Sequence, residues 1–440
     1  MENIEYIFTL FVNYARGEKL FRLIPFADSF RVGTIESLLG SESVSPIELM
    51  NKIGPPDHYR LNPKIASIVA PLERLFFALL DSKISTKWTP VVKDERILVL
   101  RTDHIGDMVL SSSFFRNLRR SFPDAEITVM CRKMNEQLAR LMEGVDRVEV
   151  MNTPWLARGD RGKLGQTLKT LWCQRNRYDL ALDLHPHPFN IVLGKILAKR
   201  MAGFDFRGFG FLLDLALADS PPGTHVVDRN LRLVEAVGGR VDNATLHLAV
   251  PTECTERVRA FLAEQGIEPN DFLVTIHPGA GMPSKEWPAD RFAALIELFS
   301  GYPSIRVLLV EKDITRVNPI VAGLQNTERI HNLSGALGLL ELIALIQQSK
   351  MLIGLESMVV HVAASVGTPV VELHSGQSSS GEWGVYQGDY EIITKDVDCA
   401  PCGRTRCEDN LCMTLITPTE VFSATKRLAA KVYGDESPFR

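Results

Sequence analysis

From Arg96 onward, short continuous apolar runs alternate with longer stretches of helical periodicity. Runs of strand length, rich in Ile, Leu and Val, occur at 97–101, 125–131, 178–184, 272–279, 305–310, 351–355 and 368–374. Strands that are buried on both faces have this composition, and the helices between them serve as the crossovers of a parallel sheet. The pattern therefore predicts an α/β fold with two doubly wound units and ligand clefts at the carboxyl ends of their strands.

The alternation breaks between residues 218 and 243, which divides the 440-residue chain. The expected parts are a helical extension (1–93), an N-terminal domain (94–245), a C-terminal domain (246–395), and a Cys-rich loop with a C-terminal helix from Pro418 (396–440). The extension is assigned because its residues have helical periodicity and few strand signals. We expect the C-terminal helix to pack back across the two domains.

Charge and hydropathy exclude several classes of protein. The net charge of −4 and the pI near 6.2 give no basic surface for nucleic acid. No apolar run reaches the ~18 residues of a membrane-spanning helix, and the N-terminus lacks the small-residue cleavage site of a secretory signal. We therefore expect a cytoplasmic protein without a nucleic-acid partner. The helical stretch 64–85 either packs on the domains or makes peripheral contact with the inner membrane, and its few cations and Pro71 favour packing.

The loop RTDHIGD, directly after the first strand, is rich in titratable side chains at the point where a helix begins. Glycine allows a tight turn, and an acid at a helix N-terminus is stabilised by the free N–H groups there. Asp107 is therefore either a helix cap or, since this end of the strand faces the cleft, a catalytic base. Asp103, His104 and Gly106 complete the loop.

The loop HPGAGMPSKEWP follows the first strand of the second unit. Backbone N–H groups in a Gly-x-Gly turn can form an anion-binding nest, and a nearby lysine adds charge-assisted contacts to a diphosphate. The other interpretation of Lys285 is a solvated surface charge. The candidate residues of this loop are His277, Gly279, Ala280, Gly281, Ser284 and Lys285.

A third loop, GLESMVVH, again joins a strand to a helix. Glu356 and Ser357 occupy positions typical of a helix N-cap. His361 faces either the core or the cleft. Glu311 directly follows the strand at 305–310.

Together these loops and HVVDRNLRLVEAVG (225–238) resemble the ADP-heptose:lipopolysaccharide heptosyltransferases, glycosyltransferase family 9, over roughly residues 95–425. The resemblance implies two Rossmann-like domains of the GT-B type. It also implies an enzyme that transfers a sugar, heptose in the first instance, with inversion from a nucleotide-diphosphate donor to a hydroxyl of a cell-envelope saccharide or glycolipid.

By position, the resemblance makes Asp107 the base and Lys285 the cation that contacts donor phosphate or sugar. It makes the first loop acceptor-side and the second and third loops, with Glu311, donor-binding. The roles are chemically consistent, because a carboxylate can remove the acceptor proton while cations and amides stabilise the leaving diphosphate. The resemblance implies no cofactor for catalysis.

The chain departs from the family at Glu356-Ser357-Met358, where the family has Asp, Ser or Thr, and Gly. Met358 replaces a glycine that permits close approach of the backbone to phosphate or sugar. An alternative is therefore a catalytically inactive sugar-nucleotide-binding or partner protein of the same fold. A third interpretation is another GT-B sugar-nucleotide enzyme such as an epimerase, because fold alone does not fix chemistry.

Four of the seven cysteines fall in DCAPCGRTRCEDNLCM, with C-x2-C-x4-C-x4-C spacing. Four thiolates can form a tetrahedral Zn or Fe site, and this spacing favours a structural metal at Cys399, Cys402, Cys407 and Cys412. Reduced loop thiols are the next interpretation, and a cytoplasmic location disfavours disulfides. Cys131, Cys173 and Cys254 are expected to be reduced and buried.

Overall fold

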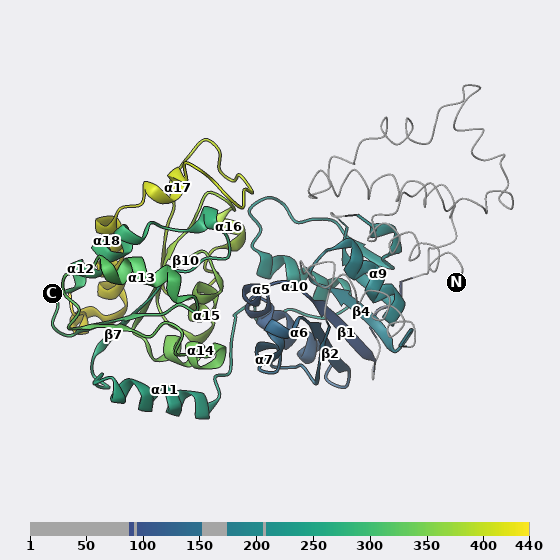
Figure 1. The fold of residues 1–440 in the computed structure, drawn as a ribbon. Coiled ribbons are helices and arrows are strands. Elements are labelled where there is room, and N and C mark those ends of the chain that lie inside the picture. The colour runs from purple at the N-terminus through teal and green to yellow at the C-terminus, as the bar shows by residue number, and fades with distance from the viewer. Residues whose placement is uncertain (1–87, 92–94, 152–173, 206–207, 440) are drawn as a thin grey trace, which may run out of the picture. The chain divides into compact units, whose positions relative to one another are not determined.

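The computed structural model describes residues 88–91, 95–151, 174–205 and 208–439 (Figure 1). The helical extension predicted for 1–93, including the stretch 64–85, therefore lies outside the described residues, apart from 88–91. Cys173 lies outside them too. Contacts between Cα atoms divide the chain into two compact units. Among the described residues the smaller unit holds 88–90, 95–100, 151, 174–205 and 208–219, and the larger unit holds 91, 101–150 and 220–439.

Two six-stranded sheets organise the chain, in the orders β3-β2-β1-β4-β5-β6 and β12-β11-β10-β7-β8-β9. The paired strands run parallel, for example β1 with β4 and β10 with β7. Counted along the chain, each sheet has the doubly wound order 3-2-1-4-5-6, with its order reversing at β1/β4 or at β7/β10. The α/β fold predicted from the alternation of strands and helices is confirmed.

The first sheet comprises β1 (Arg96–Arg101), β2 (Glu126–Cys131), β3 (Arg147–Val150), β4 (Tyr178–Asp183), β5 (Ala198–Phe204) and β6 (Leu215–Leu217). The second comprises β7 (Phe272–His277), β8 (Ile305–Leu309), β9 (Ile330–Asn332), β10 (Met351–Leu355), β11 (Val370–Leu373) and β12 (Tyr390–Ile393). The expected strands all form. The alternation did not indicate β5, β6, β9 or β12, which are short or, as in AKRMAGF, carry charge at the start.

The helices of eight or more residues are α6 (Ser112–Ser121), α9 (Pro188–Leu197), α10 (Val226–Ala236), α11 (Thr252–Glu264), α12 (Ala289–Phe299), α13 (Ile314–Ala322), α14 (Leu339–Gln348), α15 (Met358–Val366) and α18 (Pro418–Tyr433). Shorter ones are α5 (Ile105–Val109), α7 (Glu136–Ala139), α16 (Ser380–Trp383) and α17 (Leu411–Thr414). The break at 218–243 contains α10. In Figure 1, α18 lies beside α12, and it also packs on β11 and β12. Within the described residues, no helix combines the length and apolarity needed to cross a membrane.

The helix expected after the first strand is interrupted, and its two parts are α5 and α6. In a continuous helix the Asp107 carbonyl would accept from the backbone N–H of Ser111. Here that carbonyl accepts from the Arg101 guanidinium and from the Ser111 hydroxyl, while the Ser111 N–H bonds to Met108. The interruption thus follows from the side chains of Arg101 and Ser111.

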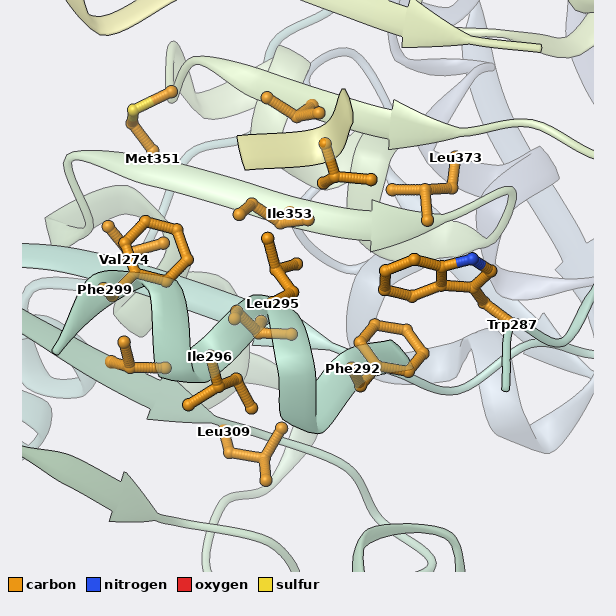
Figure 2. Close-up of a cluster of buried hydrophobic side chains, with 14 of the residues drawn as sticks. Val274, Trp287, Phe292, Leu295, Ile296, Phe299, Leu309, Met351, Ile353 and Leu373 are labelled. Atoms are coloured by element: carbon orange, nitrogen blue, oxygen red, sulfur yellow. The ribbon is translucent and has the colours of Figure 1, made fainter. Parts of the chain in front are cut away.

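The core of the second sheet supports the loop that carries Lys285. Figure 2 shows Phe292, Leu295 and Phe299 of α12 pointing toward strand residues of this buried cluster. Trp287 packs edge-on against Phe292, with ring centroids 4.7 Å apart, and its indole N–H donates to the Ile416 carbonyl at 3.1 Å. A buried Trp with a satisfied N–H is a strong anchor. The chain two residues after Lys285 is therefore fixed in the core.

Candidate functional site

One buried cation, Arg101 at the end of β1, organises the acceptor-side loop. Its side chain is 1% exposed, and its Nε and Nη2 donate to the Asp107 carbonyl at 3.0 and 2.7 Å. Its guanidinium nitrogens also lie 3.3 Å from Asp103 Oδ2 and 3.5 Å from Asp107 Oδ1. Two carboxylates therefore share one guanidinium. This role of Arg101 was not predicted, although an arginine at the buried end of an otherwise apolar run is a usable signal.

Asp107 does cap a helix. Its Oδ2 accepts the His104 backbone N–H at 3.3 Å and lies 3.6 Å from His104 Nδ1. The side chain is still 14% exposed, more than the 8% of Asp103. The cap therefore leaves Asp107 accessible to an acceptor, and its role as a base stays a prediction.

Asp103 and His104 titrate unusually. Burial raises the pKa of Asp103 to about 7, since it outweighs the charge of Arg101, and the Asp107 carboxylate acts in the same direction. The contact with Asp107 raises the pKa of His104 against the opposing effect of burial. The two shifts have different causes, burial for Asp103 and the hydrogen bond to Asp107 for His104, but the Asp107 carboxylate raises both pKa values.

The second loop is shaped by Glu311, which follows β8. A Cβ atom added to Gly279 would lie 1.5 Å from Glu311 Oε2, so glycine is what allows Glu311 its position. A Cβ at Gly281 would meet nothing within 4 Å. Neither glycine has a positive φ, so Gly279 is favoured by the lack of space for a side chain and not by its backbone conformation. The Ala280 carbonyl accepts from Arg316 at 2.7 Å, which holds the turn.

Glu311 has one satisfied and one unsatisfied carboxylate oxygen. Oε1 accepts the backbone N–H groups of Lys312 and Asp313 at 2.8 and 3.2 Å. The buried Oε2 accepts no hydrogen bond from the described residues and faces His277 Nε2 at 3.7 Å. Burial lowers the pKa of His277, more than the Glu311 charge raises it, so this imidazole is neutral near pH 7. Glu311 Oε2 is therefore a buried acceptor without a hydrogen-bond donor among the described residues.

Lys285 forms an ion pair with Glu356, at 2.6 Å between Nζ and Oε1. Lys285 is 15% exposed and Glu356 5%, so the solvated-charge interpretation of Lys285 is wrong. The Glu356 carboxylate also accepts from the Ser378 hydroxyl at Oε1 and from the Ser375 hydroxyl at 2.9 Å at Oε2. Burial opposes ionisation of Glu356, yet the charges of His374 and Lys285 hold its pKa below the usual range.

A second buried carboxylate and a histidine extend this cluster. Glu356 Oε2 lies 3.7 Å from His374 Nε2, and His374 Nδ1 lies 2.7 Å from Glu372 Oε1. Glu372 is fully buried, and its Oε2 accepts the Val385 backbone N–H at 2.9 Å. From the sequence, TPVVELH is predicted only to be a strand. A glutamate inside a buried strand, with His-Ser at its carboxyl end, is the signal that could have revealed these residues.

The first turn of α15 completes the site. The Ser357 hydroxyl and His361 Nδ1 are buried and have no hydrogen-bond partner among the described residues. Burial lowers the pKa of His361 to about 4, while the charges of Asp107 and Glu356 both act in the raising direction. His361 therefore lies within electrostatic range of the acceptor-side and donor-side carboxylates.

Within the larger unit, α5 packs on this first turn of α15. A Cβ atom at Gly106 would lie 3.3 Å from His361 Cδ2 and 3.4 Å from the Cα atom of Met358. Gly106 thus permits a close approach of backbone to backbone. The structure brings the predicted loops together here: Asp107 on α5, and Glu356, Ser357 and His361 at the start of α15.

Ser284 does not present its polar groups to the site. Its N–H and hydroxyl donate to the carbonyls of Thr405 and Arg404, at 3.3 and 2.7 Å, in the Cys-rich loop. The same loop donates from the Cys402 N–H to the Gly376 carbonyl at 3.0 Å. Ser284 therefore ties the Lys285 loop to the Cys-rich loop, which is a supporting role.

The cysteines of that loop are free thiols. Burial raises the pKa of Cys412, and the charges of Cys402, Cys399 and Cys407 add to the effect, so the four thiols are neighbours. Yet the described residues contain no group of three or more His, Cys, Asp or Glu arranged to hold a metal ion. The tetrahedral site predicted from the spacing is not formed in the structure. Cys131 and Cys254 are buried and free, as predicted.

Comparison with known proteins places these loops in a family. Lipopolysaccharide heptosyltransferase 3 of Escherichia coli K12 is 27% identical over 285 residues, which cover 61% of this chain and 79% of that protein. Lipopolysaccharide heptosyltransferase 2 of Salmonella typhimurium LT2 is 28% identical over 302 residues, covering 64% and 83%. The solved structure of E. coli ADP-heptose lps heptosyltransferase II shares the fold, with a TM-score of 0.59, 24% identity, and coverage of 76% and 98%.

The family model of glycosyltransferase family 9 (heptosyltransferase) matches residues 161–412, more than half of the chain. That segment contains the Lys285 loop, the Glu356 cluster and the whole second sheet. Together with the two doubly wound sheets, this match shows that the protein is an enzyme of glycosyltransferase family 9, the heptosyltransferases.

Proposed function

We propose that this chain transfers heptose, with inversion, from ADP-heptose to a hydroxyl of a lipopolysaccharide-type saccharide. The observation that carries the proposal is the packing of α5 on the first turn of α15 in the larger unit. It places an accessible carboxylate, Asp107, beside a helix start whose Ser357 hydroxyl has no partner in the described part of the chain. The donor and acceptor named here are those in the names of the relatives.

The reaction uses the two sides of this arrangement. Asp107 takes the proton of the acceptor hydroxyl while that oxygen bonds to the anomeric carbon of the donor. The bond between this carbon and the phosphate oxygen breaks on the opposite face, and its electron pair leaves with ADP. The attack from the opposite face is what inverts the configuration.

We assign donor binding to groups that lack a hydrogen-bond partner among the described residues or that can exchange their partner for a ligand. The free N–H groups at the start of α15 and the Lys285 ammonium are suited to the diphosphate. The unsatisfied Oε2 of Glu311 is suited to a ribose hydroxyl, next to the Gly279 turn. His361, neutral near pH 7, adds no charge to the site.

The test is turnover and donor binding measured separately on purified protein. With ADP-heptose and a heptose-accepting lipopolysaccharide core, Asp107→Asn is expected to lower kcat by roughly 10²–10⁴-fold. ADP-heptose should still raise the Tm of this variant, because a ligand of the folded state stabilises it. Asp290→Asn, at an exposed position in the first turn of α12, is the matched control and should leave kcat unchanged.

Two results would redirect the proposal. Full turnover by Asp107→Asn would remove this residue as the base. Donor binding by the wild type without transfer to any acceptor would favour the non-catalytic sugar-nucleotide-binding alternative, for which Met358 in place of glycine is the reason. The variant Met358→Gly then shows whether that side chain blocks the reaction.

A further inference from the structure

The buried cluster at the donor side contains more charge than diphosphate binding alone requires. We define the charge cluster as Lys285, Glu356, His374 and Glu372, which come from η6 (Pro283–Lys285), the loop after β10, the loop after β11 and β11 itself. Their side chains are 15%, 5%, 1% and 0% exposed. Ion pairs this deep are costly to desolvate, so their geometry and charge balance matter.

The sheet register places the cluster at the point where the strand order reverses. Gly354 on β10 pairs with His277 on β7, and Leu355 pairs with Leu373 on β11. The next residues along these two strands, Glu356 and His374, therefore emerge side by side, and the Glu356 N–H donates to the Leu373 carbonyl. Ligands of open α/β sheets bind at this edge.

His374 stands between the two carboxylates with one ring nitrogen toward each. Nδ1 lies 2.7 Å from Glu372 Oε1, and Nε2 lies 3.7 Å from Glu356 Oε2 and 3.4 Å from the Ser378 hydroxyl. Glu372 is itself held by the Val385 backbone N–H. A carboxylate on Nδ1 fixes the orientation of the ring and favours its charged form.

With the imidazolium present, two cations balance two carboxylates. In the free enzyme Glu356 holds Lys285 at 2.6 Å, so this carboxylate competes with a diphosphate for the ammonium. If His374 is charged, Glu356 keeps a cationic neighbour after Lys285 moves. If His374 is neutral, the cluster has a net charge of −1, which holds the ammonium on Glu356 and repels the donor.

We propose that His374 is a positioning residue that, as the imidazolium, neutralises Glu356 and frees Lys285 for the donor diphosphate, so that donor affinity falls when His374 loses its proton. This inference rests on the proposed sugar-nucleotide donor. The residues it adds to the site, His374 and Glu372, lie outside the loops that the family resemblance marked.

The direction of the pH effect follows from the surroundings of His374. Burial lowers the pKa of His374, but the hydrogen bond and charge of Glu372, with the charge of Glu356, outweigh it and hold the pKa above the ordinary value. Lys285 opposes them. The further titratable group in electrostatic contact is His361, which is neutral above about pH 4. The imidazolium is therefore the form at neutral pH, and affinity decreases as pH rises through the raised pKa.

The experiment measures the Kd of ADP-heptose by titration calorimetry across pH 6 to 9. A nucleotide-diphosphate sugar is the correct probe, because the terminal phosphate of free ADP titrates near pH ~6. For the wild type we expect Kd to increase roughly ten-fold across the His374 transition, since one buried unit charge near the diphosphate is removed. The kcat at saturating donor should change much less than KM.

Two variants separate the proposed role from a merely structural one. His374→Gln should bind donor as weakly near pH 6 as the wild type does at high pH, and its Kd should not change through the transition. Glu372→Gln removes the carboxylate that supports the imidazolium, so the transition should move to lower pH rather than disappear. It also keeps the proposal testable if His374→Gln fails to fold. His331→Gln, on β9 of the same sheet, is the control and should keep the wild-type profile.

The outcomes are distinguishable. Wild-type binding of ADP-heptose with a pH-independent Kd, or an unchanged transition in both variants, would overturn the role of His374 and leave the proposed function intact. Failure of every nucleotide-diphosphate sugar to bind the wild type would overturn the proposed function, and the role of His374 would fall with it.

Discussion

Within the larger unit, the acceptor-side loop and the charge cluster differ in how many cations accompany two carboxyl groups. In the loop, the carboxyl groups of Asp103 and Asp107 share a single buried guanidinium, and the pKa of Asp103 is raised to about 7. In the cluster, Glu356 and Glu372 face two groups that can be cationic, Lys285 and His374. An excess of carboxyl groups over cations suits a group that must accept a proton, and a balanced cluster suits a site that must receive an anion.

The strongest way to break this contrast is to remove the cation of the acceptor-side loop. Arg101→Met removes the cation beside the buried Asp103 and the partly exposed Asp107, and the donor to the Asp107 carbonyl. It should lower the free energy of unfolding by about 3–5 kcal/mol. Urea denaturation measures it. Arg96→Met, at the other end of β1, is the matched control: its side chain is 44% exposed where it pairs with Asp179, and the cost should be under about 1 kcal/mol. Equal costs for the two would contradict the loop architecture.

A pair of glycine substitutions tests the donor side. Gly279→Ala places a methyl group 1.5 Å from Glu311 Oε2, so Glu311 must move. We expect a loss of ADP-heptose affinity of roughly ten-fold, because the unsatisfied oxygen leaves its position. Gly281→Ala adds its methyl group to open space and should bind donor like the wild type. Equal Kd values for the two variants would remove Glu311 from the donor site.

The smallest expected effect concerns Asp103. Its pKa in the folded state is about 7, above the ordinary value near 3.8, so the folded state binds this proton more tightly than the unfolded state. The stability from this group is complete below about pH 4 and is lost as pH rises to about 7. Asp103→Asn should therefore gain on the wild type in urea unfolding as pH rises through this window, by at most about 1.4 kcal/mol per pH unit. The control Asp290→Asn, at an exposed position, should show no such gain. If the free energy of unfolding of Asp103→Asn depended on pH in the same way as that of the wild type, the buried position of Asp103 beside Arg101 would be contradicted.

The sequence predicted the fold well because doubly wound sheets have a local signature. Strands such as ILVLR and MLIGL are continuously apolar since both of their faces are covered, and each loop after such a strand is a candidate site. The strands that were missed, β5 and β12 among them, are short or carry charge, so their pairing rather than their composition makes them strands.

The sequence predicted the parts of the site that lie within one loop, but not the contacts between loops. Asp107 and Lys285 lie beside glycine-containing turns that can be recognised from the local sequence. The partner of Lys285 is distant in sequence, since it meets Glu356 71 residues away, and Ser284 meets Arg404 120 residues away. The partners of Asp107 are local, since Arg101 precedes it by only six residues. The four cysteines are a case where a local pattern misled, because their metal-binding spacing does not correspond to a metal-binding arrangement among the described residues.

The sequence by itself determined the two parallel sheets, the loops at their carboxyl ends and the identity of the titratable side chains. Local periodicity and backbone preferences are enough for that, because they act over a few residues. The tertiary structure alone decided which charges share a partner: Arg101 with two aspartates, and His374 between two glutamates. Burial and mutual distance set those pKa shifts and ion pairs, and both quantities exist only once distant segments are packed together.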